Sequence, residues 1–430
     1  MADSGRMDRR MTGSNWPCLR HGPAAVDIRL RASVIYLHHM AQTEPAQKRF
    51  ELLHQLVGAE WGGAALNALV DGYERRTSYA VEETTTSADD LSIRVKIRIL
   101  QERAPDAWIE WPGQHITPYI DTGAVRDITD VWEENGLVDA FTEGAKEQVR
   151  FDGSYYAIPL NIHRINNLFY NVEMVERAGV NIDVNSPQAF VDVLEQLDDA
   201  LDVAPFLMAL RNPWGAIHVW ETIVLGETDP QTYRDIINGE AGRHRDAIAS
   251  TLSILARYLE FANDDAQFSS LPDANAHFVD DEGALFLMGD WAASAYDQDA
   301  YGETWDTIPF PGTAGEYPIN MDALIPSSTA GDTTAIDEFL AYAGSREAQT
   351  AFNRHKGSTP PRTDTDRSEF TDFLQDQQAD FDAATSQVPS MAHGLAVHPE
   401  QLIEVKSTMA EFVSDPDPAT TADRLADILS

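Results

Sequence analysis

The sequence has little cysteine, little lysine and no long apolar run, and each shortage excludes a class of protein. Cys18 is the only cysteine among 430 residues, so the chain can form no internal disulfide and no cysteine-based metal site. No run of about 18 apolar residues is present, which predicts that no helix of this chain crosses a membrane. The pair His38-His39 is only a weak sign of a metal site, and the HExxH pattern of zinc proteases is absent. We therefore expect no metal site and no cofactor.

Lysine is scarce while carboxylates are abundant. The chain has 70 acidic against 31 basic residues and a formal charge of −39, and its five lysines are Lys48, Lys96, Lys146, Lys356 and Lys406. Such a charge argues against nucleic acid or an anionic membrane as a partner. At about 1 M salt the Debye length falls to roughly 3 Å, so repulsion between carboxylates is screened. The composition therefore predicts a protein from a salt-loving organism, with an acidic protein of ordinary salt as the alternative.

Residues 1–47 differ from the rest of the chain. A secretion signal needs a basic start followed by an apolar run, and Arg29 and Arg31 interrupt the one candidate run. Cys18 lies in NWPCLRHG, without the apolar and small residues that precede a lipid-modified cysteine. We predict a disordered or ill-defined extension over 1–47, with Met40 as an alternative start.

The remainder alternates between strand and helix patterns, which predicts an α/β fold with mainly parallel sheets. With 43% hydrophobic residues, the chain is too long for one ordinary core and is predicted to form two lobes. Strands are expected near 48–56, 107–111, 167–170 and 204–210, and helices near 65–73, 172–178, 186–202, 212–226 and 246–263. Ligands in such folds bind beyond the carboxyl ends of the strands.

The stretch 157–171, AIPLNIHRINNLFYN, is the most informative segment. Its composition predicts burial, yet it carries the polar side chains of Asn161, His163 and Arg164. Buried polar groups need partners, which the fold or a bound polar ligand supplies. We predict that the chain crosses here from one lobe to the other, at the floor of a cleft.

Five sequence motifs follow one another along the chain, and together they are more specific than any one of them: IPLNIHRINNLFYNVEMVERAGV, NPWGAIHVWE, LFLMGDWA, FNRHKGSTPPR and MAHGLAVHPE. On these pieces the chain resembles the extracellular solute-binding protein family 1 of ABC transporters, the sugar-binding type, and within it the glucose/galactose-binding proteins. The resemblance implies a two-lobe periplasmic-binding-protein-like fold, with parallel or mixed sheets flanked by helices and a ligand cleft between the lobes. It assigns 48–159 plus 309–355 to the first lobe and 160–308 plus 356–430 to the second.

The resemblance also implies a function. The protein would bind a neutral, glucose-like mono- or oligosaccharide, close on it like a hinge, and deliver it to ABC permease subunits without chemistry. It would be a monomer outside the cell, associated with the cell surface. Two other functions stay open: a binding protein that serves a sensor, and a glycoside hydrolase. A hydrolase needs two carboxylates about 5–9.5 Å apart, and Asp290 is the one strong candidate in the cleft segments.

Residue by residue, the resemblance implies a set of sugar contacts. The motif MGDWA gives Asp290 as an acceptor of sugar hydroxyl protons, with Trp291 beside it, and KGS gives Lys356 as a donor. The other implied contacts are His393 in MAHG, Trp214 in NPWGAIHVWE, Asn161 and His163 in NIHR, Trp111 after its strand, and Glu60 and Trp61 in place of a tryptophan pair. These residue types suit a sugar, because tryptophan faces cover C–H groups and charged side chains form strong hydrogen bonds with hydroxyls.

Each of these residues also has an ordinary structural interpretation. Asp290 would otherwise cap a helix that starts at Trp291, and Lys356 would be a solvated side chain. For the rest, the alternatives are a turn residue (His393), a core histidine (His163), support for the crossing strand (Asn161), core tryptophans (Trp61, Trp111, Trp214) and an exposed carboxylate (Glu60).

Overall fold

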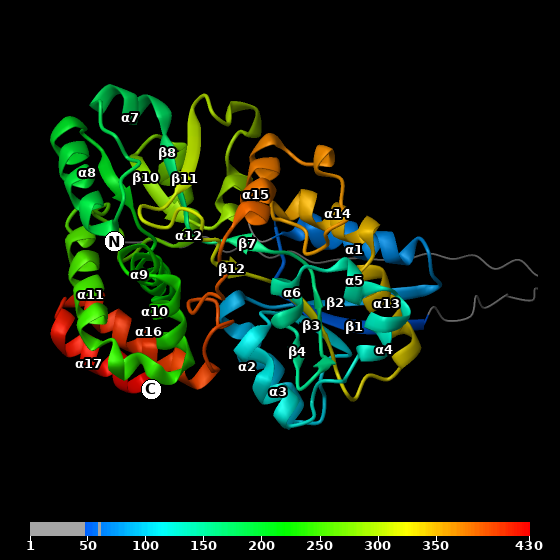
Figure 1. Cartoon of the computed structure of the whole chain (residues 1–430). Coiled ribbons are helices and arrows are strands. Elements are labelled where there is room, and N and C mark those ends of the chain that lie inside the picture. The colour runs from blue at the N-terminus through cyan, green and yellow to red at the C-terminus, as the bar shows by residue number, and fades with distance from the viewer. Residues whose placement is uncertain (1–47, 59–61) are drawn as a thin grey trace, which may run out of the picture. The chain divides into compact units, whose positions relative to one another are not determined.

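The computed structural model describes residues 48–58 and 62–430 (Figure 1). The predicted extension 1–47 and the predicted contacts Glu60 and Trp61 lie outside the described residues. Among the described helices, none combines the length and the apolar character needed to cross a membrane.

The first sheet has five strands in the order β2-β1-β3-β13-β6. Their bounds are β1 Lys48–His54, β2 Tyr79–Thr85, β3 Ala107–Glu110, β6 Ile158–Pro159 and β13 Ala323–Pro326. Strand β1 runs parallel to β2 and β3, whereas β13 runs antiparallel to β3 and β6. Its core includes the fully buried Leu52, Trp108 and Phe339. The main helices of this region are α1 Gly63–Glu74, α2 Ala88–Leu100, α13 Thr333–Ala343 and α14 Arg346–Lys356, with short helices α3 Thr117–Asp121, α4 Thr129–Glu134, α5 Leu137–Ala140 and α6 Glu143–Glu147.

The second sheet has four strands in the order β11-β8-β10-β9. Their bounds are β8 Asn167–Asn171, β9 Ala204–Leu207, β10 Gly283–Met288 and β11 Trp305–Pro309. Strand β10 is parallel to β9 and antiparallel to β8, so both large sheets are mixed and not mainly parallel. The helices of this region are α7 Val172–Ala178, α8 Pro187–Ala200, α9 Trp214–Glu227, α10 Pro230–Asp235, α11 Arg245–Leu259, α12 Leu271–Val279, α15 Asp372–Ala383, α16 Pro399–Ser414 and α17 Pro418–Ile428.

Local sequence explains where these elements begin and end. The side chain of Ser186 accepts a hydrogen bond from the backbone of Ala189, and a proline follows it at the first turn of α8. Helix α7 ends at Gly179, whose φ of 67° is left-handed and favours glycine. Asp152 and Gly153 form the turn of a hairpin between β4 Arg150–Phe151 and β5 Ser154–Tyr155.

Three chain segments connect the two sheets, and they are bonded to one another. Strand β7 His163–Arg164 pairs antiparallel with β12 Ile319–Asn320, and both lie between the two large sheets (Figure 1). Ile162 and Thr359 exchange two backbone hydrogen bonds of 2.8 and 2.9 Å. The chain thus passes from β6 to β8, returns from β11 to β13, and leaves α14 for α15. The division into lobes at particular residues stays a prediction.

Candidate functional site

A cavity of about 870 Å³ lies where parallel strands of both sheets end. In the first sheet, the residues just after β1, β2 and β3 line it: Leu56, Thr86 and Trp111. Ser92, Ile93 and Lys96 of α2 and His115 complete this side, which we call the strand-end wall. Parallel strands present their carboxyl ends at one edge of a sheet, which explains why distant segments meet here.

The residues that follow β9 and β10 line the other side, which we call the tryptophan wall. It consists of Trp214 at the start of α9, Trp291 after β10, His393, and Lys406 on α16. Gly289 allows Trp291 to fold back against the chain, because a Cβ there would lie 2.1 Å from the indole ring.

His393 stands at the centre of three tryptophan rings. Its ring centroid is 5.2 Å from Trp214, 5.3 Å from Trp291 and 5.5 Å from Trp111, each in an edge-to-face arrangement. Burial lowers the pKa of His393 well below its usual value, so the imidazole is neutral. Its Nε2 accepts a hydrogen bond of 3.1 Å from the indole Nε1 of Trp214, which leaves the proton on Nδ1 for Ser390 Oγ at 2.7 Å.

A buried carboxylate fixes the loop that carries His393. Both oxygens of Glu221, on α9, accept hydrogen bonds: from Ser390 Oγ at 2.7 Å, from Tyr233 Oη at 2.9 Å and from the backbone N–H of Met391 at 2.7 Å. Burial raises the pKa of Glu221 to about 7 in spite of these bonds. Glu221 therefore acts on the cavity through the position of His393.

The floor of the cavity is a row of hydrogen-bonded polar side chains. His163 Nδ1 lies 2.5 Å from Asp290 Oδ1, and its Nε2 lies 3.0 Å from Asn161 Nδ2. Asn161 also donates to Asp322 Oδ2 at 2.9 Å, and Asp322 is 3.7 Å from Lys356 Nζ. Asp290 and Asn161 are fully buried behind His163, so in this structure they hold its ring and do not line the cavity.

The structure thus separates the residues predicted from the sequence into three groups. Six of them line the cavity: Trp111, His163, Trp214, Trp291, Lys356 and His393. Asp290 and Asn161 lie one layer behind, and Glu60 and Trp61 lie outside the described residues. Their role as sugar contacts stays a prediction.

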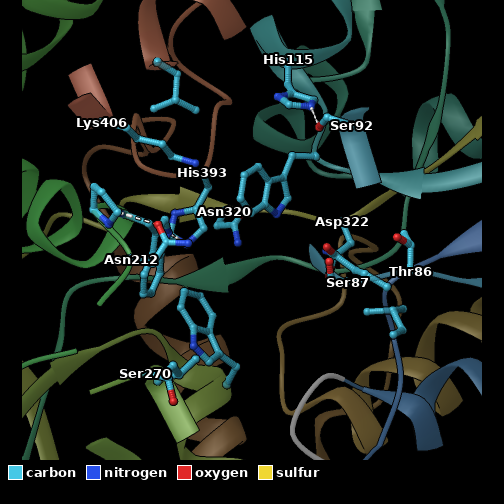
Figure 2. Close-up of a pocket in the computed structure, with 18 of the residues that line it drawn as sticks. Thr86, Ser87, Ser92, His115, Asn212, Ser270, Asn320, Asp322, His393 and Lys406 are labelled. Atoms are coloured by element: carbon cyan, nitrogen blue, oxygen red, sulfur yellow. Dashed lines mark hydrogen bonds between the residues drawn. The ribbon is translucent and has the colours of Figure 1, made fainter. Parts of the chain in front are cut away.

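Sequence reasoning missed several polar residues that line the cavity. Figure 2 shows them among the labelled side chains: Thr86, Ser87, Ser92, His115, Asn212, Ser270, Asn320, Asp322 and Lys406. Asn320 belongs to β12 and Asp322 directly precedes β13, on the segment that returns from the second sheet to the first. The others come from within helices α2 and α16 and from helix starts and loops, at positions that no motif marks. In the described part of the chain, no group of three or more His, Cys, Asp or Glu side chains is placed to hold a metal ion.

Comparison with known proteins gives consistent matches over most of the chain. The pattern of the bacterial extracellular solute-binding protein family matches residues 68–380. The chain is 31% identical over 400 residues to the xylose/arabinose-binding protein XacG of Haloferax volcanii, covering 90% of this chain and 86% of that protein. It is 25% identical over 311 residues to a probable sugar-binding periplasmic protein of Mesorhizobium japonicum, covering 70% of this chain and 73% of that protein.

Solved structures share the fold at lower identity. The bacterial solute receptor AcbH, described as preferring β-D-galactopyranose, superposes with a TM-score of 0.80 at 17% identity, covering 89% of this chain and 98% of that one. A chitin oligosaccharide binding protein superposes with a TM-score of 0.78 at 16% identity, covering 89% and 98%. These neighbours have the two-lobe α/β fold expected from the sequence.

Proposed function

Because the chain belongs to the bacterial extracellular solute-binding protein family, we propose that it is the substrate-binding component of an ABC sugar importer. It holds a mono- or oligosaccharide in the cavity between the two sheets and passes it on unchanged. The observation that carries this proposal is the group of Trp111, Trp214 and Trp291 around a neutral His393, opposite a row of polar side chains. Indole faces suit the C–H faces of a sugar ring, and the polar row suits its hydroxyls.

The cavity supports binding better than hydrolysis. A glycoside hydrolase needs two carboxylates on either side of the bond that it cleaves. Among the described residues that line the cavity, Asp322 is the single carboxylate. Asp290 is buried against His163. Transfer to a sensor in place of a permease remains the alternative destination for the sugar.

The volume of the cavity favours a ligand of more than one ring. Pockets of about 300–1,000 Å³ bind ligands of drug size, and this cavity, at about 870 Å³, lies in the upper part of that range. Binding experiments should use the glucose-like neutral sugar predicted from the sequence as the reference ligand. They should also include xylose and arabinose, because the relative from Haloferax is named for these two sugars.

We further propose that the protein works as a monomer at the cell surface and that its lobes, 48–159 plus 309–355 and 160–308 plus 356–430, close on the sugar. A ligand that contacts both walls stabilises the closed state more than the open one, so it shifts the population toward closure. Small-angle scattering would then give a smaller radius of gyration with sugar than without. An unchanged radius under proven binding would reject closure.

Calorimetry tests the proposed function directly. The purified chain, held in about 2 M KCl because of its charge of −39, is titrated with glucose, galactose, xylose, arabinose and short oligosaccharides. We expect saturable binding of at least one sugar, and chromatography of the mixture should recover that sugar intact. Steady release of smaller products would show that the protein is a hydrolase and not a binding protein.

A further inference from the structure

A second, smaller cavity adjoins the first and is called the side groove below. Its volume is about 260 Å³, against about 870 Å³ for the main cavity. One side of the groove comes from helix α12 and the residue after it, and the other comes from the short helix Asp290–Ala295 that follows β10. The lining residues are Leu271, Pro272, Asn275, Ala276, Val279, Asp280, Trp291 and Ala295.

The side groove is continuous with the main cavity through shared residues. Leu271, Pro272 and Trp291 line both. Ser270, which directly precedes α12, lines the main cavity beside them (Figure 2). The first turn of α12 and one indole ring thus separate the two spaces. Because Trp291 is half-buried and lines both, its ring offers surface to a ligand in either one.

The side groove combines apolar and hydrogen-bonding groups. Leu271, Pro272 and Val279 supply apolar surface, and Val279 is 50% exposed. The side-chain oxygen of Asn275 accepts a hydrogen bond of 3.3 Å from Tyr296 Oη, which leaves the amide nitrogen as a donor. Asp280 adds an exposed carboxylate. An indole ring with amide and carboxylate groups beside it suits the C–H face and the hydroxyls of a sugar ring.

Both sides of the side groove are fixed from beneath. The ring of Phe278, on the buried face of α12, lies 4.9 Å from that of Tyr296, just after the short helix. The start of α12 is held by a capping box, in which Ser270 and Asp273 bond each other's backbone N–H groups. A groove with fixed sides binds a ring at little cost in side-chain entropy.

An exposed apolar residue alone would indicate nothing, because such residues are scattered over the surfaces of most proteins. Seven large apolar side chains are exposed in the described part of the chain, and some of them, such as Ile97 and Leu100 of α2, line neither cavity. Val279 differs because it borders a groove that shares a tryptophan with the main cavity. This continuity points to a ligand that extends from one space into the other.

Resting on the proposed function, we propose that the side groove is a further saccharide subsite and that the ligand is an oligosaccharide. Part of the oligosaccharide lies in the main cavity. A further ring passes over Leu271 and Pro272 and lies in the groove against Trp291, Asn275 and Val279. The mono- or oligosaccharide of the proposed function is thereby narrowed to an oligosaccharide.

A series of ligand lengths tests the proposal. In about 2 M KCl, calorimetry compares the mono- to pentasaccharides of the xylose, glucose and galactose series. We expect the affinity to rise about tenfold at the length at which the added ring reaches the side groove. No rise with length would overturn the subsite and leave the sugar-binding function intact. Failure of every saccharide to bind would contradict both proposals.

Variants in the side groove show where the added ring lies. Ala276 is exposed on α12 and lines the groove but not the main cavity, so Ala276→Phe fills the groove alone. This variant should lose the tenfold gain of the longer ligand and bind the shorter one within about twofold of the wild type. Val279→Ser should weaken the longer ligand about threefold and leave the shorter one unchanged.

Ile97→Ser is the matched control for Val279→Ser, because Ile97 is a 46% exposed apolar helix residue that lines neither cavity. It should change the affinity for neither ligand, and circular dichroism checks that all three variants are folded. If Ala276→Phe keeps the full gain with length, the added ring lies in the main cavity and the proposal is overturned. Equal losses for the short and the long ligand would also overturn it, because the groove would then act by shaping the main cavity.

Discussion

The two walls of the cavity differ in how firmly their side chains are held. On the tryptophan wall, His393 is packed between indole rings and bonded to Trp214 and Ser390, and Glu221 fixes its loop. On the strand-end wall, Ile93 is 57% exposed, and Lys96 is half-buried on the same helix. A rigid surface binds a ring with little loss of side-chain entropy, whereas a mobile one adapts to what the ring carries. We therefore predict that the tryptophan wall recognises the sugar ring and that the strand-end wall recognises its substituents.

Changing Glu221, the buried carboxylate behind the tryptophan wall, should have the largest effect, and this effect is on protein stability. Glu221 has a pKa of about 7 in the folded protein against an ordinary value of 4.5, so between these two pH values the folded state holds a proton that the unfolded chain has released. Its stabilising contribution is fully present below about pH 4.5 and is lost as the pH rises toward 7. Over this window, the unfolding free energy of the wild type should fall by roughly 3 kcal/mol relative to Glu221→Gln, which does not titrate.

Urea denaturation of the two proteins across this pH window measures the difference, at constant KCl. Tryptophan fluorescence at pH 7 should also change in Glu221→Gln, because the anchor of His393 among the indoles is altered. A constant difference in stability from pH 4.5 to 7 would show that Glu221 keeps an ordinary pKa in the folded state.

Removing a ring from the tryptophan wall should have the next largest effect. Trp214→Leu removes a stacking face and the donor to His393 Nε2, and it should cost about 2 kcal/mol of sugar-binding energy. Calorimetry with the best ligand of the panel measures the loss. Unchanged affinity would mean that the ring of the sugar lies elsewhere.

The floor should contribute less, because it acts through one histidine. Asp290→Asn weakens the hold on His163 and should reduce sugar affinity by about 1.5 kcal/mol without unfolding the protein. Asp306→Asn is the matched control, since Asp306 bonds Tyr170 in the second sheet and does not line the cavity. Equal sugar affinities of Asp290→Asn and the control would mean that His163 stays in place without the carboxylate of Asp290.

The strand-end wall should give the smallest effect of the four. Trp111→Leu removes a ring that meets His393 and His115 in edge-to-face contacts, and we expect a loss of less than about 1 kcal/mol in sugar affinity. The ratio of this loss to that of Trp214→Leu measures the contrast between the walls. Equal losses in the two variants would remove the contrast.

The sequence predicted the fold class well, because strand and helix patterns are local. It missed β2, whose sequence YAVEETT contains two glutamates and lies at the edge of its sheet. Likewise, no element is predicted for 91–100, which lies within α2, where Ile93, Ile97 and Leu100 are exposed. An exposed apolar stripe obscures the usual contrast between the buried and the solvated face of a helix.

The site was predicted as far as short motifs reach. Six of the ten predicted residues line the cavity, since each sits in a motif at the end of a strand or helix. The layer to which Asp290 belongs could not be predicted, because its contact with His163 joins residues 127 positions apart. The lining of one cavity by Lys96, Lys356 and Lys406 depends on the fold in the same way.

The three paired connections between the sheets also determine how the chain responds to proteolysis and to the exchange of a lobe with a relative. Strands β7 and β12 and the segment at Thr359 each join one sheet region to the other, and their backbones are paired. A protease that cleaves one of them leaves two covalent connections, so the halves stay together and the nick is visible only after denaturation. For the same reason, a lobe exchanged between relatives has three junctions to match at once, so a single crossover cannot exchange one whole lobe.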